Sequence, residues 1–256
     1  VALALVDINR ETGAPLPAVE EAGELPGQET DVASGVTTPS AADAAPPVTP
    51  TFTPLPTATP TPSYAPAQAE VLLSGLAHWW QTWNNCGPAT LAMNLSFFGS
   101  TLNQTQVGDV LRPNKDDKNV SPHEMAAFAS AQGFRAHVLV NGDAERLRLL
   151  LSNGLPVLIE TWHEGEPNNG MGHYRLLVGY SDVAQEWIAY DSYVRPAAET
   201  PIYQGIRIPY GEFDDLWKVF NRTYILIYTE DYTPLVREIV GDDLDERLMW
   251  INALIE

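Results

Sequence analysis

Cys86, the single cysteine of this 256-residue chain, lies in a segment that favours a reactive thiolate. It is followed by Gly87 and Pro88 and then by residues 89–98, which are predicted to form a helix ending at Gly99. Proline is favoured in the first turn of a helix, because its missing N–H would have no partner there in any case. The sulfur is therefore expected where backbone N–H groups and the positive end of the helix dipole stabilise an anion.

The start of a helix does not by itself make a thiol nucleophilic. It stabilises a nearby anion by about 0.3–1 kcal/mol, which is less than one pKa unit. A free thiol titrates near about 8.5 and stays mostly protonated at neutral pH. A nucleophilic cysteine usually has a histidine that takes the proton and remains beside the sulfur. The chain offers five candidates: His78, His123, His137, His163 and His173.

His173 is the leading candidate for this partner. It follows a glycine- and asparagine-rich loop predicted at residues 163–172 and begins a predicted apolar strand at residues 173–179. Asp191 follows the next predicted strand, at residues 187–190. A hairpin centred on Asp182 would place residues 173 and 191 directly opposite each other, with both side chains on one face. The carboxylate would then orient the imidazole and stabilise its protonated form.

Further residues near Cys86 and His173 are candidates for contacts to a substrate. Acyl transfer needs hydrogen-bond donors for the oxyanion, and the Gln81 side-chain amide is predicted to act together with the backbone N–H of Cys86. Four other residues flank the proposed nucleophile and base, and they are predicted to bind substrate: Trp83, Asn85, Trp162 and Gly172. The tryptophans could equally be core aromatics.

The elements that must position these residues follow an α+β order. Helices are predicted at residues 103–111, 121–133, 143–152 and 210–220, and strands at 135–140, 155–161, 173–179, 187–190 and 223–228. Ser121 and Glu124 form a capping-box pattern, and Asp143 is placed to cap the next helix. Most of the strands follow one another at hairpin distance, so the sheet is expected to be mainly antiparallel.

The combined pattern resembles the papain-type cysteine peptidases. It is most similar to the family of bacteriocin-processing, double-glycine leader peptidases, family thirty-nine of the cysteine peptidases, and their stand-alone secreted relatives. The similarity rests on Asn-Asn-Cys86-Gly-Pro-Ala-Thr-Leu-Ala-Met, on His173-Tyr-Arg-Leu-Leu-Val-Gly-Tyr and on Ile188-Ala-Tyr-Asp191. It implies a papain-like fold, with Cys86 as nucleophile, His173 as general acid and base, Asp191 as its orienting group and Gln81 as oxyanion donor.

This chain departs from the family pattern in two places. Gln81 stands five residues before Cys86, where six are more usual, and Ser192 follows Asp191 where proline is common. The resemblance covers residues 71–229 and implies a peptide or protein substrate.

The charge of the chain excludes some partners. The formal net charge is −19, of which residues 1–70 carry −8 and residues 230–256 carry −6. Without a basic patch, nucleic acid and anionic membranes are poor partners. One cysteine excludes a thiolate-rich metal site, and His163, Glu164, Glu166 and His173 match no zinc spacing, so neither metal nor cofactor is expected. The sequence does not predict the oligomeric state.

Three regions are expected from the composition. Residues 1–70 are rich in Pro, Thr and Ala, most of all between Pro46 and Pro62, and are predicted to be a disordered, semi-stiff spacer. Residues 71–229 form the peptidase-like domain, and residues 230–256 form an acidic helical segment that could begin a further helical module. The apolar residues at positions 1–6 are too few to span a bilayer and are read as the end of a removed signal or anchor, or as an arbitrary boundary. An extracytoplasmic, secreted or surface-anchored protein is predicted.

The predicted function is hydrolysis of a peptide or amide bond through an acyl-thioester on Cys86, and the same chemistry would allow acyl transfer to an amine. Two alternatives remain open. The domain could bind peptides without cleaving them, or it could be an ancillary part of a helical-repeat scaffold protein.

Overall fold

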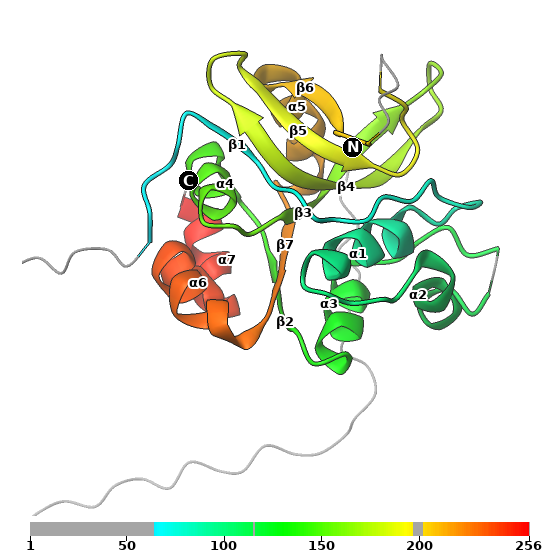
Figure 1. Ribbon diagram of the computed structural model, residues 1–256, viewed down its shortest axis with the longest axis horizontal. Coiled ribbons are helices and arrows are strands. Elements are labelled where there is room, and N and C mark those ends of the chain that lie inside the picture. Colours follow the sequence, from blue (N-terminus) through cyan, green and yellow to red (C-terminus); the bar gives the residue numbers. More distant parts are fainter. Residues whose placement is uncertain (1–63, 115, 197–201, 256) are drawn as a thin grey trace, which may run out of the picture. The chain divides into compact units, whose positions relative to one another are not determined.

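The sheet and helices that surround Cys86 are seen in a computed structural model, which describes residues 64–114, 116–196 and 202–255 (Figure 1). These residues lie within one unit, Ala58–Glu256. Most of the predicted spacer, including the tract from Pro46 to Pro62, lies outside the described residues.

A seven-stranded antiparallel sheet forms the centre of this unit. Its order is β2–β7–β3–β4–β5–β6, and β1 pairs with β4 beyond the end of β3. The strands are β1 (Glu70–Leu72), β2 (Arg135–Leu139), β3 (Val157–Glu164), β4 (Gly170–Ser181), β5 (Glu186–Asp191), β6 (Ile206–Pro209) and β7 (Tyr224–Tyr228).

Helices cover both faces of the sheet (Figure 1). The first group is α1 (Cys86–Phe97), α2 (Gln104–Leu111) and α3 (Pro122–Ala131); the second is α4 (Ala144–Ser152), α5 (Tyr210–Trp217), α6 (Thr233–Val240) and α7 (Glu246–Ile255). Each group packs its apolar residues against one face, which gives two hydrophobic cores separated by the sheet. The predicted α+β fold is confirmed.

The central strands are apolar on both faces because both faces are buried. In β4, Leu176 and Val178 pack in the core below α1, while Leu177 packs in the core on the α4 and α5 side. All three side chains have little or no exposed surface. A strand covered on both faces reads as a continuous apolar run rather than as an alternating pattern. This explains why residues 174–180 contain a single charged residue, Arg175.

Side-chain caps fix three helix starts. Asn103, Ser121 and Asp143 each accept hydrogen bonds from backbone N–H groups in the first turn of α2, α3 and α4. The predicted capping box of Ser121 and Glu124 is confirmed, with the Glu124 carboxylate accepting from the Ser121 N–H at 2.7 Å. These caps satisfy N–H groups that have no partner within the helix.

The β3–β4 hairpin is longer than the sequence predicted. The expected loop at residues 163–172 is reduced to residues 165–169, because Trp162 pairs with Gly172 and His163 with Met171. Gly170 makes room for the hairpin end, since a Cβ atom there would lie 1.9 Å from the Trp162 ring. Two of the glycines that suggested a loop, Gly170 and Gly172, therefore belong to β4, while Gly165 lies in the shortened loop.

The register of the β4–β5 hairpin also differs from the prediction. Asp191 pairs with Arg175 and not with His173. The turn at residues 182–185 places Ser181 opposite Glu186. If this register continued along the hairpin, the side chains of Asp191 and His173 would lie on opposite faces of the sheet. A β-bulge at Val178 adds one residue to β4 and restores the shared face. The expectation of a common face is therefore confirmed, and the direct pairing was wrong.

Two features near the C-terminus differ from the predicted elements. The expected helix at residues 210–220 is α5 followed by a 3-10 turn, Lys218–Phe220, which ends at Asn221 with a φ of 52°. The acidic segment is helical as predicted, and Val236, Val240 and Met249 pack in the core on the α4 and α5 side. The C-terminal helices therefore contribute to the same core as the sheet.

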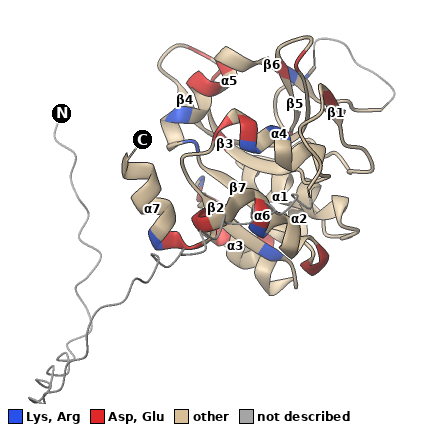
Figure 2. Ribbon diagram, turned by 90° about the vertical axis from the view of Figure 1, so that its left-hand side faces the viewer, with Lys and Arg blue, Asp and Glu red and all other residues tan. Residues whose placement is uncertain are grey.

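Figure 2 shows basic residues scattered among more numerous acidic ones over the described part of the chain. Within that part, no helix has the length and apolar character needed to span a membrane.

Candidate active site

Cys86 is the first residue of α1, and the start of this helix has no side-chain cap. The preceding residue, Asn85, is buried and turned toward α2. Its amide nitrogen donates to the backbone and side-chain oxygens of Gln104 at 3.2 and 3.0 Å, and its oxygen accepts from Arg112 Nη1 at 3.0 Å. The Asn85 side chain is therefore engaged inside the protein, and its contact with a substrate stays a prediction. The first N–H groups of α1 remain available to an anion.

α1 is joined to β4 through the backbone of Tyr174. The Tyr174 N–H donates to the Cys86 sulfur, and the Tyr174 carbonyl accepts from the Thr90 hydroxyl at 3.2 Å. The last pair of the β4–β5 ladder is Arg175 with Asp191, and Tyr174 lies one residue beyond it. Since β5 has ended there, α1 supplies the hydrogen-bond partners of the Tyr174 backbone in its place.

His173 lies between Cys86 and Asp191. Its Nε2 donates to Asp191 Oδ1 at 2.9 Å, and the ring also forms a hydrogen bond with the Cys86 side chain. Because Nε2 is engaged by the carboxylate, Nδ1 is the nitrogen left to face the sulfur. The structure thus brings together the three residues that the sequence singled out, from the start of α1, the beginning of β4 and the end of β5.

Asp191 is held in place from several directions. It has no exposed surface, and Oδ1 also accepts from the backbone N–H groups of Tyr193 and Val194 at 2.7 and 2.8 Å. Burial opposes its charge, but hydrogen bonds and the positive charges of His173 and Arg175 lower the pKa of Asp191 below its usual range. Asp191 is therefore an ionised, fixed acceptor.

The site favours a charged pair between sulfur and imidazole. Burial raises the pKa of the Cys86 thiol, but the hydrogen bond and charge of His173 and the N–H groups of Tyr174 and Gly87 outweigh it and lower that pKa. Burial likewise opposes protonation of His173, yet its bonds and charge interactions with Asp191 and Cys86 raise its pKa from 6.5 to about 9. At neutral pH the arrangement stabilises a thiolate beside an imidazolium.

A buried ring of hydrogen bonds begins and ends at His173 and holds it in place. Asp191 Oδ2 accepts from Arg175 Nε at 2.8 Å, and Arg175 Nη1 donates to the Thr161 hydroxyl. That hydroxyl donates to the His173 carbonyl at 3.2 Å. The sequence analysis missed Arg175 and Thr161, although an arginine inside an apolar strand was a usable signal, because a buried arginine requires a partner.

Gln81 is attached to the strand end that carries Asp191. Its backbone N–H donates to the Ser192 carbonyl at 2.8 Å, and its side-chain oxygen accepts from the Ser192 hydroxyl at 2.8 Å. The amide oxygen is thereby fixed, which leaves the amide nitrogen as a donor. Ser192, a departure from the usual proline, supplies a bond that proline cannot make.

The sequence model of the Peptidase_C39-like family matches residues 72–224 of this chain. The chain belongs to this family. The matched residues include the nucleophile-like helix start, both strands that carry His173 and Asp191, and most of the sheet. The α6 and α7 helices follow the matched region.

The chain is also similar to several solved structures. A protein from Bacillus anthracis described as a C39-like peptidase is 17% identical, with a TM-score of 0.50, and the alignment covers 64% of this chain and 99% of that one. The peptidase domain of Streptococcus ComA, a bifunctional ABC transporter of a quorum sensing pathway, is 17% identical with a TM-score of 0.45, covering 61% and 100%. Xylellain, a cysteine protease from Xylella fastidiosa, is 12% identical with a TM-score of 0.47, covering 66% and 91%. No curated protein has a matching sequence.

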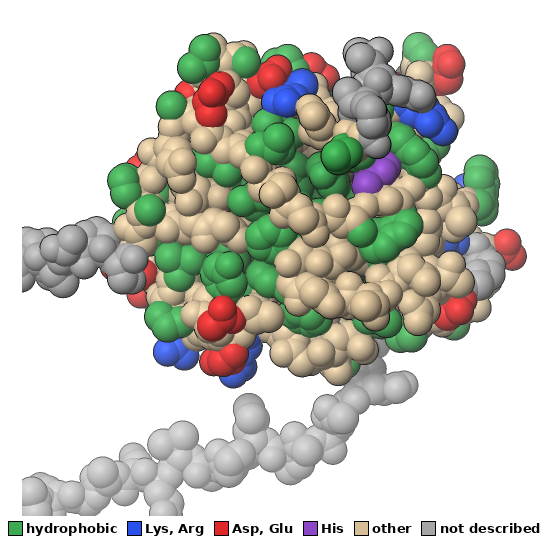
Figure 3. All heavy atoms as spheres, in the orientation of Figure 1, with side chains coloured by type: hydrophobic (Ala, Val, Ile, Leu, Met, Phe, Trp, Pro, Cys, Tyr) green, Lys and Arg blue, Asp and Glu red, His purple; other side chains and the backbone are tan. Residues whose placement is uncertain are grey.

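Other predicted contact residues of the C39-like domain lie at its surface. Trp83 is 79% exposed. Gly172 is also exposed and lies beside Glu160, since a Cβ atom at position 172 would be 2.9 Å from the Glu160 carboxylate oxygen. Trp162 is half-buried and donates from Nε1 to Glu164 at 3.1 Å. On the face seen in Figure 3, hydrophobic and uncharged groups occupy the middle, with histidine atoms visible among them, while charged side chains lie mainly at the margin.

The remaining histidines have other surroundings. His78 Nε2 donates to the Asp191 carbonyl at 2.8 Å and its ring stacks on Tyr203, with 3.6 Å between ring centres, so it supports the strand end. His137 lies in β2 and bonds the Tyr228 hydroxyl at 3.0 Å. Within the described ranges, no three His, Cys, Asp or Glu side chains gather in a way that could hold a metal ion.

Proposed function

We propose that this C39-like domain is a cysteine peptidase that cleaves a peptide bond through an acyl-thioester on Cys86. The observation that carries the proposal is the buried chain from the Cys86 sulfur through His173 to Asp191, with the pKa of the thiol lowered and that of the imidazole raised to about 9. A thiolate beside a proton donor is the arrangement that acyl transfer from an amide requires.

The first half of the reaction forms the thioester. The Cys86 thiolate attacks the carbonyl carbon, and the negative charge moves to the carbonyl oxygen. The backbone N–H of Cys86 and the Gln81 amide nitrogen are the donors assigned to this oxyanion. When the C–N bond breaks, the His173 imidazolium gives its proton to the leaving nitrogen, and the acyl group remains on sulfur.

The second half returns the enzyme to its starting state. Neutral His173 takes a proton from a water molecule, and the resulting hydroxide attacks the thioester carbonyl. The collapsing intermediate releases a carboxylic acid and restores the thiolate beside the imidazolium. Asp191 stays ionised throughout and keeps Nε2 protonated, so that Nδ1 carries each transferred proton.

The test is the reactivity of Cys86 toward iodoacetamide and an epoxide probe at neutral and mildly acidic pH. A thiolate held by His173 should react at both values, and His173→Ala should abolish the reaction at the acidic value. His137→Ala serves as the matched control, because His137 bonds only the Tyr228 hydroxyl through its ring nitrogen. Labelling of the wild type that follows an ordinary thiol titration would favour a peptide-binding domain without catalysis.

We also propose, from sequence composition, that the protein acts outside the cytoplasm, with residues 1–70 as a spacer. The tract from Pro46 to Pro62 supports a stiff, extended segment. Fractionation of the source cells tests this location, and recovery of the full-length chain from the cytoplasm alone would contradict it.

A further inference from the structure

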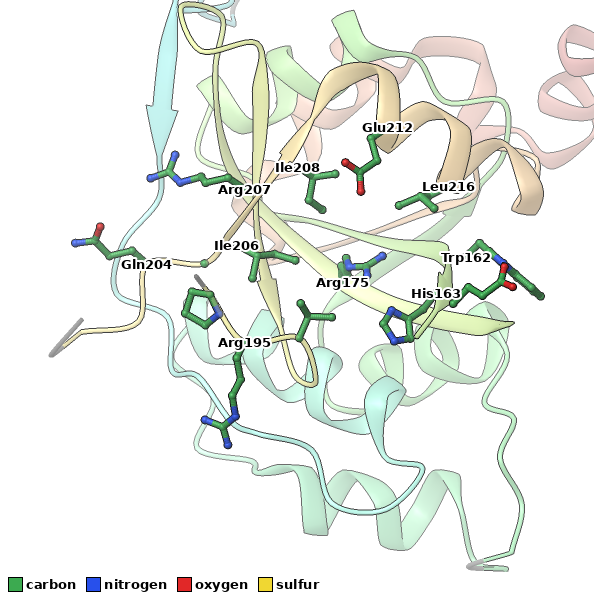
Figure 4. A pocket seen from close by; sticks show the side chains of 14 residues that line it. Trp162, His163, Arg175, Arg195, Gln204, Ile206, Arg207, Ile208, Glu212 and Leu216 are labelled. Atoms are coloured by element: carbon green, nitrogen blue, oxygen red, sulfur yellow. The ribbon is translucent and has the colours of Figure 1, made fainter. Parts of the chain in front are cut away.

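A cavity lies beside His173 on the face of the sheet opposite α1. Its volume is about 560 Å³, within the range of small-ligand sites. β6 and α5 form one side of it, with Ile206, Ile208 and Leu216 as apolar walls, and the ends of β3 and β4 form the other. In Figure 4 these three side chains, Arg175 and His163 gather around the centre of the cavity.

Arg175 presents an unused donor at the base of the cavity. The residue is 4% exposed, and its Nε and Nη1 are engaged by Asp191 and Thr161. Its Nη2 makes no hydrogen bond to any residue that the structure describes. Because the two other nitrogens fix the guanidinium plane, Nη2 is a donor of fixed position that an occupant of the cavity could use.

Most other charged groups at the cavity are engaged elsewhere. Arg207 pairs with Glu186 at 3.4 Å, and Arg195 lies over the Trp80 ring. Both side chains project away from the centre in Figure 4, whereas the exposed Glu212 of α5 points toward it. Glu164 also lines the cavity, but its carboxylate accepts from Trp162 Nε1 and the Asn168 N–H. The cavity therefore combines apolar walls, the Arg175 donor at the base and the Glu212 carboxylate on the opposite wall.

His163 connects the cavity with the reaction centre. It lines the cavity, and its ring centre is 5.5 Å from that of His173. Burial and the nearby charges of His173 and Arg175 lower the pKa of His163, so it is neutral at neutral pH. In the proposed reaction His173 must reach the leaving nitrogen to protonate it, so the residues that follow the scissile bond lie on the side of His173. The cavity is lined by His163, next to the His173 ring, and so lies on this side.

We infer that the cavity binds a side chain from the leaving-group half of the peptide and favours an amide, glutamine or asparagine. Its methylene groups would pack on Ile206, Ile208 and Leu216, its oxygen would accept from Arg175 Nη2, and its NH2 group would donate to Glu212. A carboxylate would accept from Arg175 but face Glu212, and a purely apolar side chain would leave both groups without a partner. The inference rests on the proposed peptidase function.

The test uses peptides that differ only at one of the first three positions after the cleaved bond, with Gln, Glu or Met there. For the wild type, kcat/KM is expected to be about tenfold higher for Gln than for Met, and several-fold higher for Gln than for Glu. Glu212→Gln should remove or reverse the preference for the Gln peptide over the Glu peptide. Arg207→Gln is the control, because it removes a charge near the cavity that points elsewhere, and it should leave the ranking of the peptides unchanged.

A binding measurement keeps this inference separate from catalysis. The leaving-group half of each peptide, carrying a fluorophore, is titrated into Cys86→Ala and followed by anisotropy. About tenfold tighter binding of the Gln fragment than of the Met fragment supports the inference, and equal dissociation constants overturn it, whether or not the wild type cleaves. Failure of Cys86 labelling would instead contradict the proposed peptidase function.

Discussion

The starts of α1 and α3 show two uses of the same helix geometry. At α3, Ser121 and Glu124 satisfy the free N–H groups with side chains. At α1, Asn85 stands in the capping position but turns to Gln104 and Arg112, and the N–H groups are left for the Cys86 sulfur and, in the proposed reaction, for an oxyanion. The difference teaches that a functional helix start gives up a stabilising cap. The stability is recovered nearby, through the buried bonds of Asn85.

The largest expected effect comes from removing His173, the charge partner of Cys86 at the uncapped start of α1. His173→Ala should lower the rate of peptide cleavage by about 10³-fold or more, because both the thiolate and the proton donor are lost. The pKa of Cys86 should rise, measured by thiolate absorbance against pH. An unchanged thiol pKa would mean that the start of α1 alone stabilises the anion. His137→Ala provides the control.

The pH dependence should report both members of the pair. Activity should rise as pH increases through the lowered pKa of Cys86 and fall as pH passes about 9, where His173 loses its proton. The raised pKa of His173 also contributes stability that is complete below 6.5 and lost as pH rises through about 9. Rate profiles and thermal unfolding between about pH 4 and 10 test both statements. A profile that rises through an ordinary thiol pKa and shows no decline near 9 would contradict the charged pair.

Asn85→Ala tests whether the uncapped start of α1 depends on this buried amide. The change leaves Arg112, which is 3% exposed, without its bond to the Asn85 oxygen and removes two bonds to Gln104. The free energy of unfolding should fall by about 2 kcal/mol, because the buried Arg112 loses one of its acceptors while keeping the backbone carbonyls of Trp83 and Asp117. Denaturant titration measures this loss. A fall no larger than that of Ser121→Ala would contradict the compensating role of Asn85.

Ser192→Ala should have a smaller effect, confined to catalysis. The Gln81 amide loses the hydroxyl that fixes its oxygen, so its nitrogen should be less well aimed at the oxyanion, and kcat should fall about tenfold. KM and the rate of Cys86 labelling should change little, because neither depends on the oxyanion donor. An equal fall in kcat for Ser192→Ala and Gln81→Ala would mean that Ser192 provides all of the positioning.

The smallest effect is expected at the capped helix. Ser121→Ala removes the cap of α3 and should lower the free energy of unfolding by about 1 kcal/mol, measured by denaturant titration. The rate of Cys86 labelling should not change, since α3 contributes no N–H group to the sulfur. A slower rate of labelling would show that the two helix starts are coupled through the core they share.

Local signals predicted much of the fold. The caps of Ser121 and Asp143 and the apolar strands around residues 157, 176 and 226 depend on neighbours in the sequence, and each was read correctly. The ends of the β3–β4 hairpin were predicted wrongly, because Gly170 was taken for a loop residue. The Trp162 ring, which packs against Gly170, explains why a glycine is needed in the strand. Similarly, Asn85 was predicted to contact substrate, and its bond to Arg112, 27 positions away, becomes apparent only in the fold.

For the candidate site, the amino-acid sequence by itself determined which side chains could do the chemistry: one thiol before Gly-Pro, a histidine that opens an apolar strand, and an aspartate at the end of the next. Tertiary structure decided how they meet. The bulge at Val178 gives His173 and Asp191 a common face, and the end of β5 frees the Tyr174 backbone for α1. Residue types and local spacing encode chemistry and caps, whereas strand register, the partner of a buried Arg175 and the shape of a cavity depend on contacts between distant segments.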